Sequence, residues 1–469
     1  MAPWQIASSE PVRLVPVDTD APTPAASDHF YDVVIVGAGP SGSACAYWLA
    51  SAGWDVAVVE KKTFPRVKTC GDGLTPRSVR QIADMGLEEA VAAQGHKYHG
   101  LRSYGFGRSI EMTWPEHPSF PSYGYCVTRF DLDGLVSANA ARQGATVFNG
   151  TEVIDVIDAA PGAPGDLTSC TGFIVKDKAT GTTAEVRGRI VVVADGANSR
   201  VGRLLGTERR REWPMGMALR GYYTSPRHDD DFIESHLDIR DAEGNVVPGY
   251  GWIFPLGDGR VNVGVGLLST DRRWKGINTS RLMETFVDFA PDSWEISPET
   301  ATGPATGGRL PMGLSVGPRI GTNVLVVGDA SGSINPFNGE GITYGYETGR
   351  LAAASIGESL AGGGAEALRH YEDRLQQAYG SYYDVARAFV RLISEPKLMA
   401  MCVGVGMRSE TLMTELLALM ANLMRPDDRG PAEVGYRVML GLGAILPDRA
   451  LAALFNDEKK PLVGVAKAS

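Results

Sequence analysis

The sequence lacks the features of disulfide-rich, metal-binding and nucleic-acid-binding proteins. Its 469 residues include only five cysteines, none in a C-x-x-C pair: Cys45, Cys70, Cys126, Cys170 and Cys402. An odd, scattered set of cysteines argues against a disulfide framework and is typical of a reducing compartment. The pair His96 and His99 has no acid or cysteine at a spacing that would complete a metal site, so we expect no metal.

Positive charge and long apolar runs are also in short supply. The 45 Lys and Arg residues face 55 Asp and Glu residues, a formal net charge of −10, which disfavours nucleic acid and offers no strongly basic surface for anionic lipid. The two most apolar stretches, 398–407 and 412–424, fall short of the roughly 18 to 20 residues that a membrane-spanning helix needs. These stretches either pack against the rest of the protein or form a methionine-rich surface that binds a hydrophobic ligand or a membrane.

Length and composition indicate a soluble protein of roughly two to three domains. Hydrophobic residues make up 43% and charged residues 21%, which is ordinary for a globular chain. Residues 1–29 are rich in Pro, Ala, Ser and Asp and have no basic start followed by an apolar core. We therefore expect a disordered N-terminal extension there rather than a secretory signal.

The most informative stretch runs from Tyr31 to Glu60. An apolar run leads into the turn GAGPSG, a helix-like segment follows, and a second apolar run ends in Glu60. Strand, glycine turn, helix, strand and acid in this order are the dinucleotide-binding βαβ pattern. Gly37 permits the tight turn, Gly39 lets a pyrophosphate approach the backbone, and Gly42 lets the helix pack close to the strand. The helix N-terminus offers N–H groups to phosphate, and Glu60 can accept hydrogen bonds from a ribose.

Two further apolar strands end in an acid beside a glycine. The run IVVV is followed by Asp195-Gly196, and the run VLVV by Gly328-Asp329. All-apolar strands are typical of a parallel sheet that is buried on both faces. An acid at the carboxyl end of such a strand can face the ligand crevice. The glycine-rich segment that leads from Asp329 to the next helix can form a second binding site for polar or anionic groups of a cofactor.

The segment KKTFPRVKTCGDGL, directly after the second strand of the βαβ motif, is rich in glycine and cations. It is either a surface loop or a loop laid against an anionic cofactor. In the second case Arg66 and Lys68 balance phosphate charge, while Gly71 and Gly73 permit close approach.

Arg129 stands at the start of a helix that we expect to reach about residue 142, with Asp131 as its cap. Its guanidinium either completes a surface ion pair or reaches the cofactor. The surrounding regions, 99–128 and 216–268, alternate apolar and polar residues and predict antiparallel strands. In the second region, Tyr250, Trp252 and Phe254 share one face of a strand, which must be either sheet core or an apolar ligand wall.

Together these motifs resemble the flavoprotein superfamily that includes the aromatic hydroxylases, over about residues 31–360. Its members bind FAD with the glycine turn on the pyrophosphate, the first acid on the adenosine ribose and the Gly-Asp acid near the ribityl chain. The resemblance implies that Glu60 contacts the adenosine ribose and that Asp329 lies near the ribityl chain. It also implies that Arg129 is the arginine that contacts the cofactor. The residues that we expect at FAD are Gly37, Gly39, Pro40, Ser41, Gly42, Glu60, Lys61, Arg129, Val153, Asp195, Gly196, Asp329, Gly341 and Ile342.

Two stretches, PRVKTCGDGL and YGWIFP, look like the signatures of the geranylgeranyl reductase family, and other segments look closest to its menaquinone reductase branch. The resemblance implies saturation of C=C bonds in a polyprenyl chain, a menaquinone tail or a geranylgeranyl group, by hydride from reduced flavin plus a proton. As catalytic residues we expect Cys70, beside the flavin for proton delivery or positioning, with Tyr250 and Trp252 lining an apolar tunnel. A small buried thiol is the alternative role of Cys70.

The expected fold is α/β, with a split Rossmann-like FAD-binding domain of the glutathione-reductase type found in the aromatic hydroxylases. An antiparallel β-sheet substrate domain and a helical C-terminal region complete it. The expected bounds are 30–98, 129–205 and 319–360 for the FAD-binding domain, 99–128 and 206–318 for the substrate domain, and 361–469 for the helical region.

No second glycine-turn βαβ motif is present in the sequence, so the electron donor is either NAD(P)H, visiting the flavin without its own domain, or another carrier. We expect a polyprenyl lipid substrate, no nucleic acid, and a cytoplasmic location with peripheral contact to the inner face of the cell membrane. Two alternatives stay open. One is an FAD-dependent monooxygenase or halogenase acting on a hydrophobic or aromatic substrate, and the other is a non-catalytic lipid-binding flavoprotein.

Overall fold

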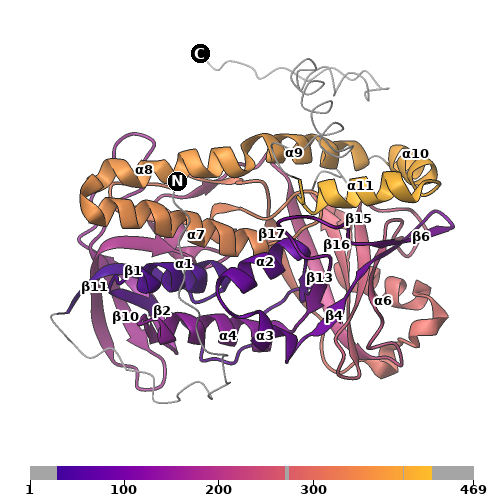
Figure 1. The fold of residues 1–469 in the computed structure, drawn as a ribbon, viewed down its shortest axis with the longest axis horizontal. Coiled ribbons are helices and arrows are strands. Elements are labelled where there is room, and N and C mark those ends of the chain that lie inside the picture. The colour runs from indigo at the N-terminus through magenta and orange to yellow at the C-terminus, as the bar shows by residue number, and fades with distance from the viewer. Residues whose placement is uncertain (1–28, 270–273, 395, 425–469) are drawn as a thin grey trace, which may run out of the picture.

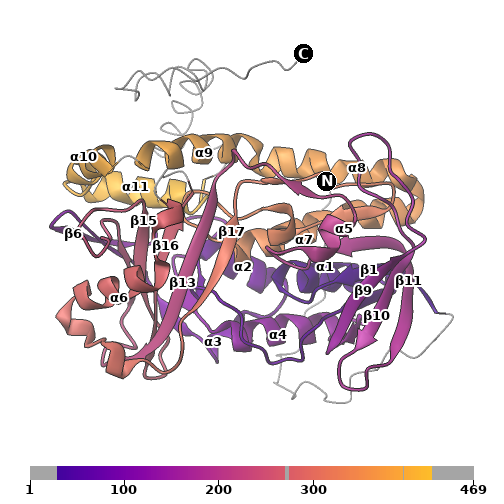
Figure 2. The ribbon, with the colours of Figure 1, turned by 180° about the vertical axis from the view of Figure 1, so that it is seen from behind.

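The computed structural model describes residues 29–269, 274–394 and 396–424 (Figure 1). The expected disordered extension therefore lies outside the described residues apart from its last residue, as does the end of the C-terminal region after residue 424. Figures 1 and 2 show two β-sheet domains side by side, with the C-terminal helices α8 and α9 running along both.

The first domain is built on a seven-stranded sheet with the order β8-β2-β1-β11-β10-β9, in which β19 also pairs with β11. β1 is parallel to β2 and β11, and β11 is parallel to β19, whereas β9, β10 and β11 pair antiparallel. Three distant parts of the chain thus form one sheet, which confirms the predicted Rossmann-like α/β fold. The strands are β1 (Phe30–Val36), β2 (Val56–Val59), β8 (Thr146–Phe148), β9 (Thr151–Ile157), β10 (Gly172–Asp177), β11 (Thr183–Val193) and β19 (Val324–Val326).

The apolar strands of this sheet are buried on both faces. Val33 and Ile35 pack in one core with helices α1, α4 and α7, while Val34 and Val36 pack in a second core with Phe173 of β10. This two-sided burial is the reason that residues 33–36 of β1 and 190–193 of β11 are continuously apolar, whereas residues 183–189 of β11 alternate. The helices of this domain are α1 (Pro40–Ser51), α2 (Pro76–Asp84), α3 (Glu88–Ala92), α4 (Arg129–Arg142), α5 (Arg200–Leu204), the 3₁₀ turn η4 (Gly328–Ser331) and α7 (Ile342–Glu358).

The second domain is built on another seven-stranded sheet, with the order β17-β13-β16-β15-β14-β5-β6. Helix α6 covers one face, where a Cβ on Gly251 would lie 2.4 Å from the Phe286 ring. The opposite face carries Tyr250, Trp252 and Phe254. The elements are β5 (Gly100–Gly105), β6 (Arg108–Thr113), β13 (Met215–Thr224), β14 (Phe232–His236), β15 (Gly249–Pro255), β16 (Arg260–Leu268), α6 (Thr279–Phe289) and β17 (Thr306–Pro311), with the 3₁₀ turns η1 (Trp274–Gly276), η2 (Asp292–Trp294) and η3 (Pro298–Thr300).

Two small sheets lie beside the large ones. In the three-stranded sheet, β7 pairs antiparallel with both β3 and β4, so the end of the Cys70 loop is held by backbone hydrogen bonds. The other joins a short strand that precedes β13 in the chain to one that follows β17. The strands are β3 (Gly73–Leu74), β4 (His96–Tyr98) and β7 (Gly124–Cys126) in the first, and β12 (Glu208–Arg209) and β18 (Val316–Gly317) in the second.

The helical region returns along both domains, and its last two helices pack on the second sheet. Met413 and Leu417 are buried in one core with Met112 and Trp114. Among the described residues, no helix has the length and apolar character needed to cross a bilayer. The elements are the π-helical turn η5 (Ser359–Gly363), α8 (Gly364–Leu375), the π-helical turn η6 (Gln376–Gly380), α9 (Ser381–Ile393), α10 (Pro396–Gly406) and α11 (Glu410–Met420).

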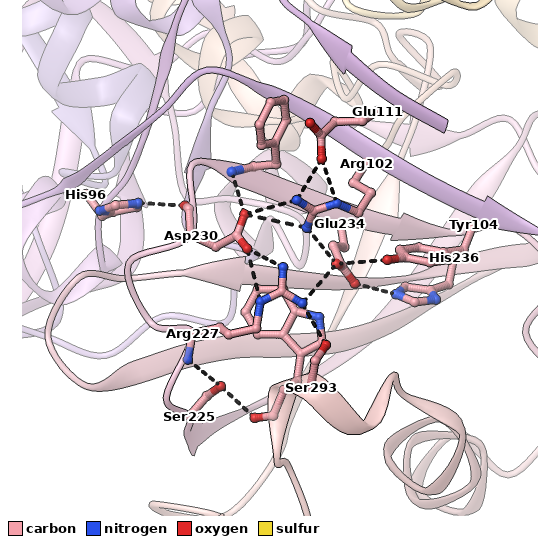
Figure 3. A network of polar contacts seen from close by, with 12 residues as sticks. His96, Arg102, Tyr104, Glu111, Ser225, Arg227, Asp230, Glu234, His236 and Ser293 are labelled. Carbon is pink, nitrogen blue, oxygen red and sulfur yellow. Dashed lines mark hydrogen bonds and ion pairs between the residues drawn. The ribbon is translucent and has the colours of Figure 1, made fainter. Parts of the chain in front are cut away.

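An ionic network lies on the face of the second sheet opposite to Trp252, because Glu234 is paired with Ile253, the next residue along β15. Figure 3 shows the contacts of this network. The fully buried carboxylate of Glu234 accepts a hydrogen bond from Arg102 at 2.9 Å, lies 3.9 Å from Arg227 and 3.2 Å from His236. Asp230 pairs with the same two arginines. Because each buried charge has partners of opposite sign, the network ties β5 to β14 without an uncompensated charge.

Candidate active site

One cavity of about 1060 Å³ runs from the glycine turn of the first domain to helices α10 and α11. Every residue that the sequence predicts for the site lines it, with the single exception of Gly42. At one end lie the carboxyl ends of β1, β2 and β11 with the start of α7, and at the other end lie Met399, Cys402, Met413 and Leu417. A polar end and an apolar end thus share one continuous space.

The glycine turn has the shape that a pyrophosphate requires. Gly37 has φ +100°, and a Cβ there would lie 2.4 Å from the Ala194 carbonyl oxygen. Gly42 lies behind the turn, where a Cβ would lie 1.9 Å from the Gly37 oxygen, so its role is to let α1 pack closely. No side chain caps α1 at Gly39. The N–H groups of its first turn therefore remain available to an anion.

Glu60 lies beside this turn, fixed by two main-chain hydrogen bonds. Its Oε2 accepts from the Ala38 N–H at 2.9 Å and its Oε1 from the Lys62 N–H at 3.0 Å. The side chain of Arg66 reaches across from the following loop, with its Nε 3.6 Å from Glu60. A Cβ on Gly39 would lie 3.8 Å from Arg66 Nη2, so the cation-rich loop does lie against the glycine turn.

The two remaining strand-end acids face the same cavity. Asp195 Oδ2 accepts from the Val201 N–H at 2.9 Å, whereas its Oδ1 is buried with no hydrogen-bond partner among the described residues. Burial raises the pKa of Asp195. Asp329 lies 3.8 Å from Lys68 Nζ and next to Gly341, which precedes α7 at the N-cap position and provides no capping side chain. The buried Oδ1 of Asp195 and the carboxylate of Asp329 can accept hydrogen bonds from hydroxyl groups of FAD. The first N–H groups of α7 can donate to its anionic groups.

Arg129 makes the ion pair that the sequence left open, but the pair is buried rather than on the surface. Its guanidinium holds Asp133 with two hydrogen bonds of 2.6 and 2.8 Å, and the side chain also lines the cavity. The predicted cap was wrong. Thr128 caps α4 by accepting from the Asp131 N–H, because its hydroxyl stands one residue before the helix and Asp131 already lies in the first turn.

Cys70 lies in the loop that crosses from the cofactor end to the second sheet. Burial raises the pKa of its thiol against the opposing effect of Arg129, so the group is a neutral thiol at ordinary pH. The Phe254 ring covers this loop, since Cβ atoms on Gly71 and Gly73 would each lie 3.1 Å from it. The close approach of an aromatic ring therefore explains why both positions are glycine.

The aromatic face of β15 lines the cavity, which favours a ligand wall over closed sheet core. Tyr250 donates its hydroxyl to the Asn338 carbonyl oxygen at 2.7 Å, and Trp252 donates its indole N–H to Asn262 at 2.9 Å. The Trp252 ring centroid lies 5.8 Å from that of Tyr250 and 6.2 Å from that of Phe254. Each polar tip is thereby satisfied at the edge, and the rings present apolar surface to the cavity.

Sequence reasoning missed Asp72, Arg220 and Glu340, which line the cavity, and Asn262, which donates a hydrogen bond to Asp72. Arg220 is buried with its Nε unpartnered among the described residues. The Glu340 carboxyl accepts from three hydroxyls through Oε1, while Oε2 has no partner in the described part of the chain. Two of these residues could have been found from their sequence context. Asn262 is a lone polar residue in an apolar strand, and Asp72 stands between two glycines.

Comparison with known proteins gives consistent matches across most of the chain. A family model described as an FAD binding domain matches residues 30–233. A menaquinone reductase of Mycolicibacterium smegmatis is 42% identical over 397 residues, which is 85% of this chain and 93% of that protein. A digeranylgeranylglycerophospholipid reductase of Methanopyrus kandleri is 30% identical over 370 residues, 78% of this chain and 91% of that protein.

A solved structure has the same fold. It is a geranylgeranyl bacteriochlorophyll reductase-like protein of Thermoplasma acidophilum, with a TM-score of 0.70 at 20% identity, and the match covers 88% of this chain and 99% of that chain. The similarity therefore extends over both sheet domains and well beyond the glycine turn.

Proposed function

We propose, on the premise that this chain belongs to the geranylgeranyl reductase family of FAD-dependent oxidoreductases, that its substrate is the polyprenyl tail of a menaquinone. As a member of this family it is an FAD-dependent reductase of polyprenyl C=C bonds. The choice of menaquinone rests on the identity to the M. smegmatis reductase, which exceeds that to the relative from Methanopyrus kandleri.

The observation that carries this proposal is the continuity of the cavity from the glycine turn to the apolar helices. An isolated trisubstituted alkene is a poor hydride acceptor, because no carbonyl spreads the developing charge. The protein must therefore hold the alkene in one orientation and exclude water from it. Bound FAD supplies the hydride in its reduced state. A cavity with FAD-fitting acids at one end and methionines at the other satisfies both demands.

The chain's own residues take the following roles in this proposal. The glycine turn and Glu60 bind the pyrophosphate and adenosine ribose, and Asp329 holds the sugar chain near the start of α7. Tyr250 and Trp252 form the wall against which the alkene lies. Cys70, a neutral thiol beside them, delivers the proton or positions the alkene. A Cys70→Ala protein that keeps its FAD and its full rate of alkene saturation would remove Cys70 from the mechanism.

The apolar end of the cavity offers a route for the lipid. Met401, Val405 and Leu412 line the cavity and are also 58%, 60% and 50% exposed, so the cavity opens to the surface between α10 and α11. Exposed apolar residues around an opening fit a surface that lies on a bilayer. We therefore place this opening against the inner face of the cell membrane, where a menaquinone tail can enter it. NAD(P)H or another carrier supplies the electrons.

Mass spectrometry of quinones from cells with and without this protein tests the substrate. The proposal expects menaquinone whose tail carries two additional hydrogens only in cells that contain the protein. An unchanged quinone pool would contradict it. The rival functions give other results: a monooxygenase or halogenase would couple reductant oxidation in air to a hydroxylated or halogenated product. A lipid-binding flavoprotein would bind polyprenyl quinone, yet its flavin would never bleach with any donor.

A further inference from the structure

The cavity wall contains a fully buried carboxylate that connects the two domains. Asp72 has φ +64°, stands between two glycines, and is 0% exposed. Its Oδ1 accepts from the Arg129 main-chain N–H at 3.1 Å, while its Oδ2 accepts from the Tyr222 hydroxyl at 2.6 Å and Asn262 Nδ2 at 2.7 Å. Burial raises the pKa of Asp72, whereas these hydrogen bonds and the positive charge of Arg220 oppose that rise. Both oxygens thus receive donors, as a carboxylate requires.

The amide of Asn262 is held in one orientation by its surroundings. Nδ2 donates to Asp72 and to the Cys70 carbonyl oxygen at 2.9 Å, and Oδ1 accepts the indole N–H of Trp252. Rotation of the amide by half a turn would place its oxygen against two acceptors and its N–H groups against a donor. Since Asn262 is 0% exposed, no water could satisfy the misplaced groups. Asp72 and the Cys70 carbonyl therefore determine where the acceptor for Trp252 lies.

The Trp252 ring is held both by the backbone of β16, against which it packs, and by the hydrogen bond of its indole N–H. A Cβ on Gly264 would lie 2.1 Å from the indole, so the ring rests directly on the β16 backbone. A Cβ on Gly71 would lie 3.6 Å from the indole nitrogen, which places the Cys70 loop at the same edge. Cys70 on the first domain and Trp252 on the second domain therefore share a single anchor.

We propose that Asp72 and Asn262 are positioning residues, a buried carboxylate–amide relay that fixes Trp252 against the Cys70 loop and so determines which double bond is reduced. This inference rests on the proposed function. A polyprenyl tail repeats the same unit, so sliding by one unit presents an equivalent alkene to the same place. The alkenes themselves do not distinguish one register from another, so contacts between the tail and the cavity wall must do so. Trp252 is one of two tryptophans in that wall, together with Trp114. A loosened ring therefore admits more than one register.

The test compares wild-type holoenzyme with Asp72→Asn and Asn262→Leu, using menaquinone as the probe and tandem mass spectrometry of the product. Glu234→Gln is the matched control, because it also changes a fully buried acid, but one that lies in β14 and faces away from the cavity. The relay predicts that kcat falls about 10- to 100-fold in Asp72→Asn and in Asn262→Leu, with KM changed less than about twofold. It also predicts saturation at several positions of the tail. Glu234→Gln keeps a single position whatever its stability.

A second measurement needs no substrate. The chain has eight tryptophans, and Trp252→Phe identifies the indole N–H signal of Trp252 in a ¹H–¹⁵N spectrum. The relay predicts that Asp72→Asn shifts this signal and speeds its hydrogen exchange, and that Glu234→Gln does neither. Variants of Asp72 and Asn262 that retain FAD, one product position and an unshifted Trp252 signal would overturn the relay. Wild-type protein that reduces no menaquinone would overturn the proposed substrate instead, while the spectrum still decides the relay.

Discussion

The carboxylate of Glu60 accepts a hydrogen bond from the main-chain N–H of Ala38 at 2.9 Å, which fixes the acid at the end of β2 against the glycine turn. Glu60 lines the cavity at this point, where the proposal places the adenosine ribose. Glu60→Ala should therefore weaken FAD binding about 10- to 100-fold, the effect of a lost hydrogen bond to a charged group. Fluorescence titration of apoprotein with FAD measures this change.

The matched control for Glu60 is Asp55→Ala, at the other end of the same strand. Asp55 lies outside the cavity lining, and its partner is His29 at 2.7 Å. Its removal should leave the dissociation constant for FAD unchanged. Equal weakening in both variants would mean that β2 itself, rather than the acid, supports the cofactor.

Gly42 supports the cofactor site through packing alone, because it does not line the cavity. A Cβ there would lie 1.9 Å from the Gly37 oxygen and 3.2 Å from Ala194 Cβ, so Gly42→Ala must push α1 away from the turn. Such overpacking costs about 1 to 3 kcal/mol, and we expect FAD affinity to fall by roughly 5- to 100-fold. Gly134→Ala, in α4 with nothing near its Cβ, should keep FAD and gain about 0.5 to 1 kcal/mol. Full FAD content in Gly42→Ala would refute the packing role.

The network of Figure 3 makes stability depend on pH through Asp230. Burial opposes its ionisation, but the Phe232 N–H and the guanidinium groups of Arg227 and Arg102 lower its pKa. A folded pKa below the unfolded value of about 3.9 gives stability that is present above pH 4 and lost as pH falls through the folded pKa.

Asp230→Asn should accordingly lower the free energy of unfolding by about 1 to 3 kcal/mol near pH 7. The difference in unfolding free energy between this variant and wild type should shrink as the solution is acidified. Thermal midpoints of both proteins over a pH series measure it. A stability difference that stays constant down to the lowest pH of the series would show that the contribution of Asp230 does not come from its charge.

The opening between α10 and α11 should govern access of a membrane-embedded substrate. The double variant Val405→Asp and Leu412→Asp places charge on two side chains that are at least half exposed. Its binding to vesicles of phosphatidylcholine and phosphatidylglycerol should fall at least about tenfold in a flotation assay, because buried apolar area drives such binding. Phe289→Asp, which changes an exposed ring on α6, is the matched control. Equal flotation of all three proteins would place the membrane contact elsewhere.

Local motifs allowed much of the fold and of the cofactor end to be predicted from the sequence. The glycine turn, the all-apolar strands and the acid at each strand end are encoded within a few residues, and each reports burial or a turn directly. The aromatic face of β15 was recognisable by alternation, although only the structure decides that it faces a cavity. Arg129 was singled out, and its partner Asp133 follows four residues later, a spacing that a helix brings together.

The relay could not be predicted because its contacts join residues far apart in the chain. Asp72 and Asn262 are 190 residues apart, and each has an ordinary local setting in a loop and a strand. A lone polar residue in an apolar strand signals only that a partner is needed, not which one. The cap of α4 was missed for a simpler reason, since Thr128 and Asp131 both favour helix starts and the boundary is shifted by a few residues between the two choices.

One anaerobic experiment tests the central claim most directly. The FAD-loaded protein is reduced chemically, mixed with menaquinone, and the quinone is re-oxidised before mass spectrometry, so that reduction of the ring does not register. The account predicts that the tail retains two added hydrogens for each flavin oxidised. Menaquinone recovered with an unchanged tail, from protein that has bound both FAD and the quinone, would contradict it.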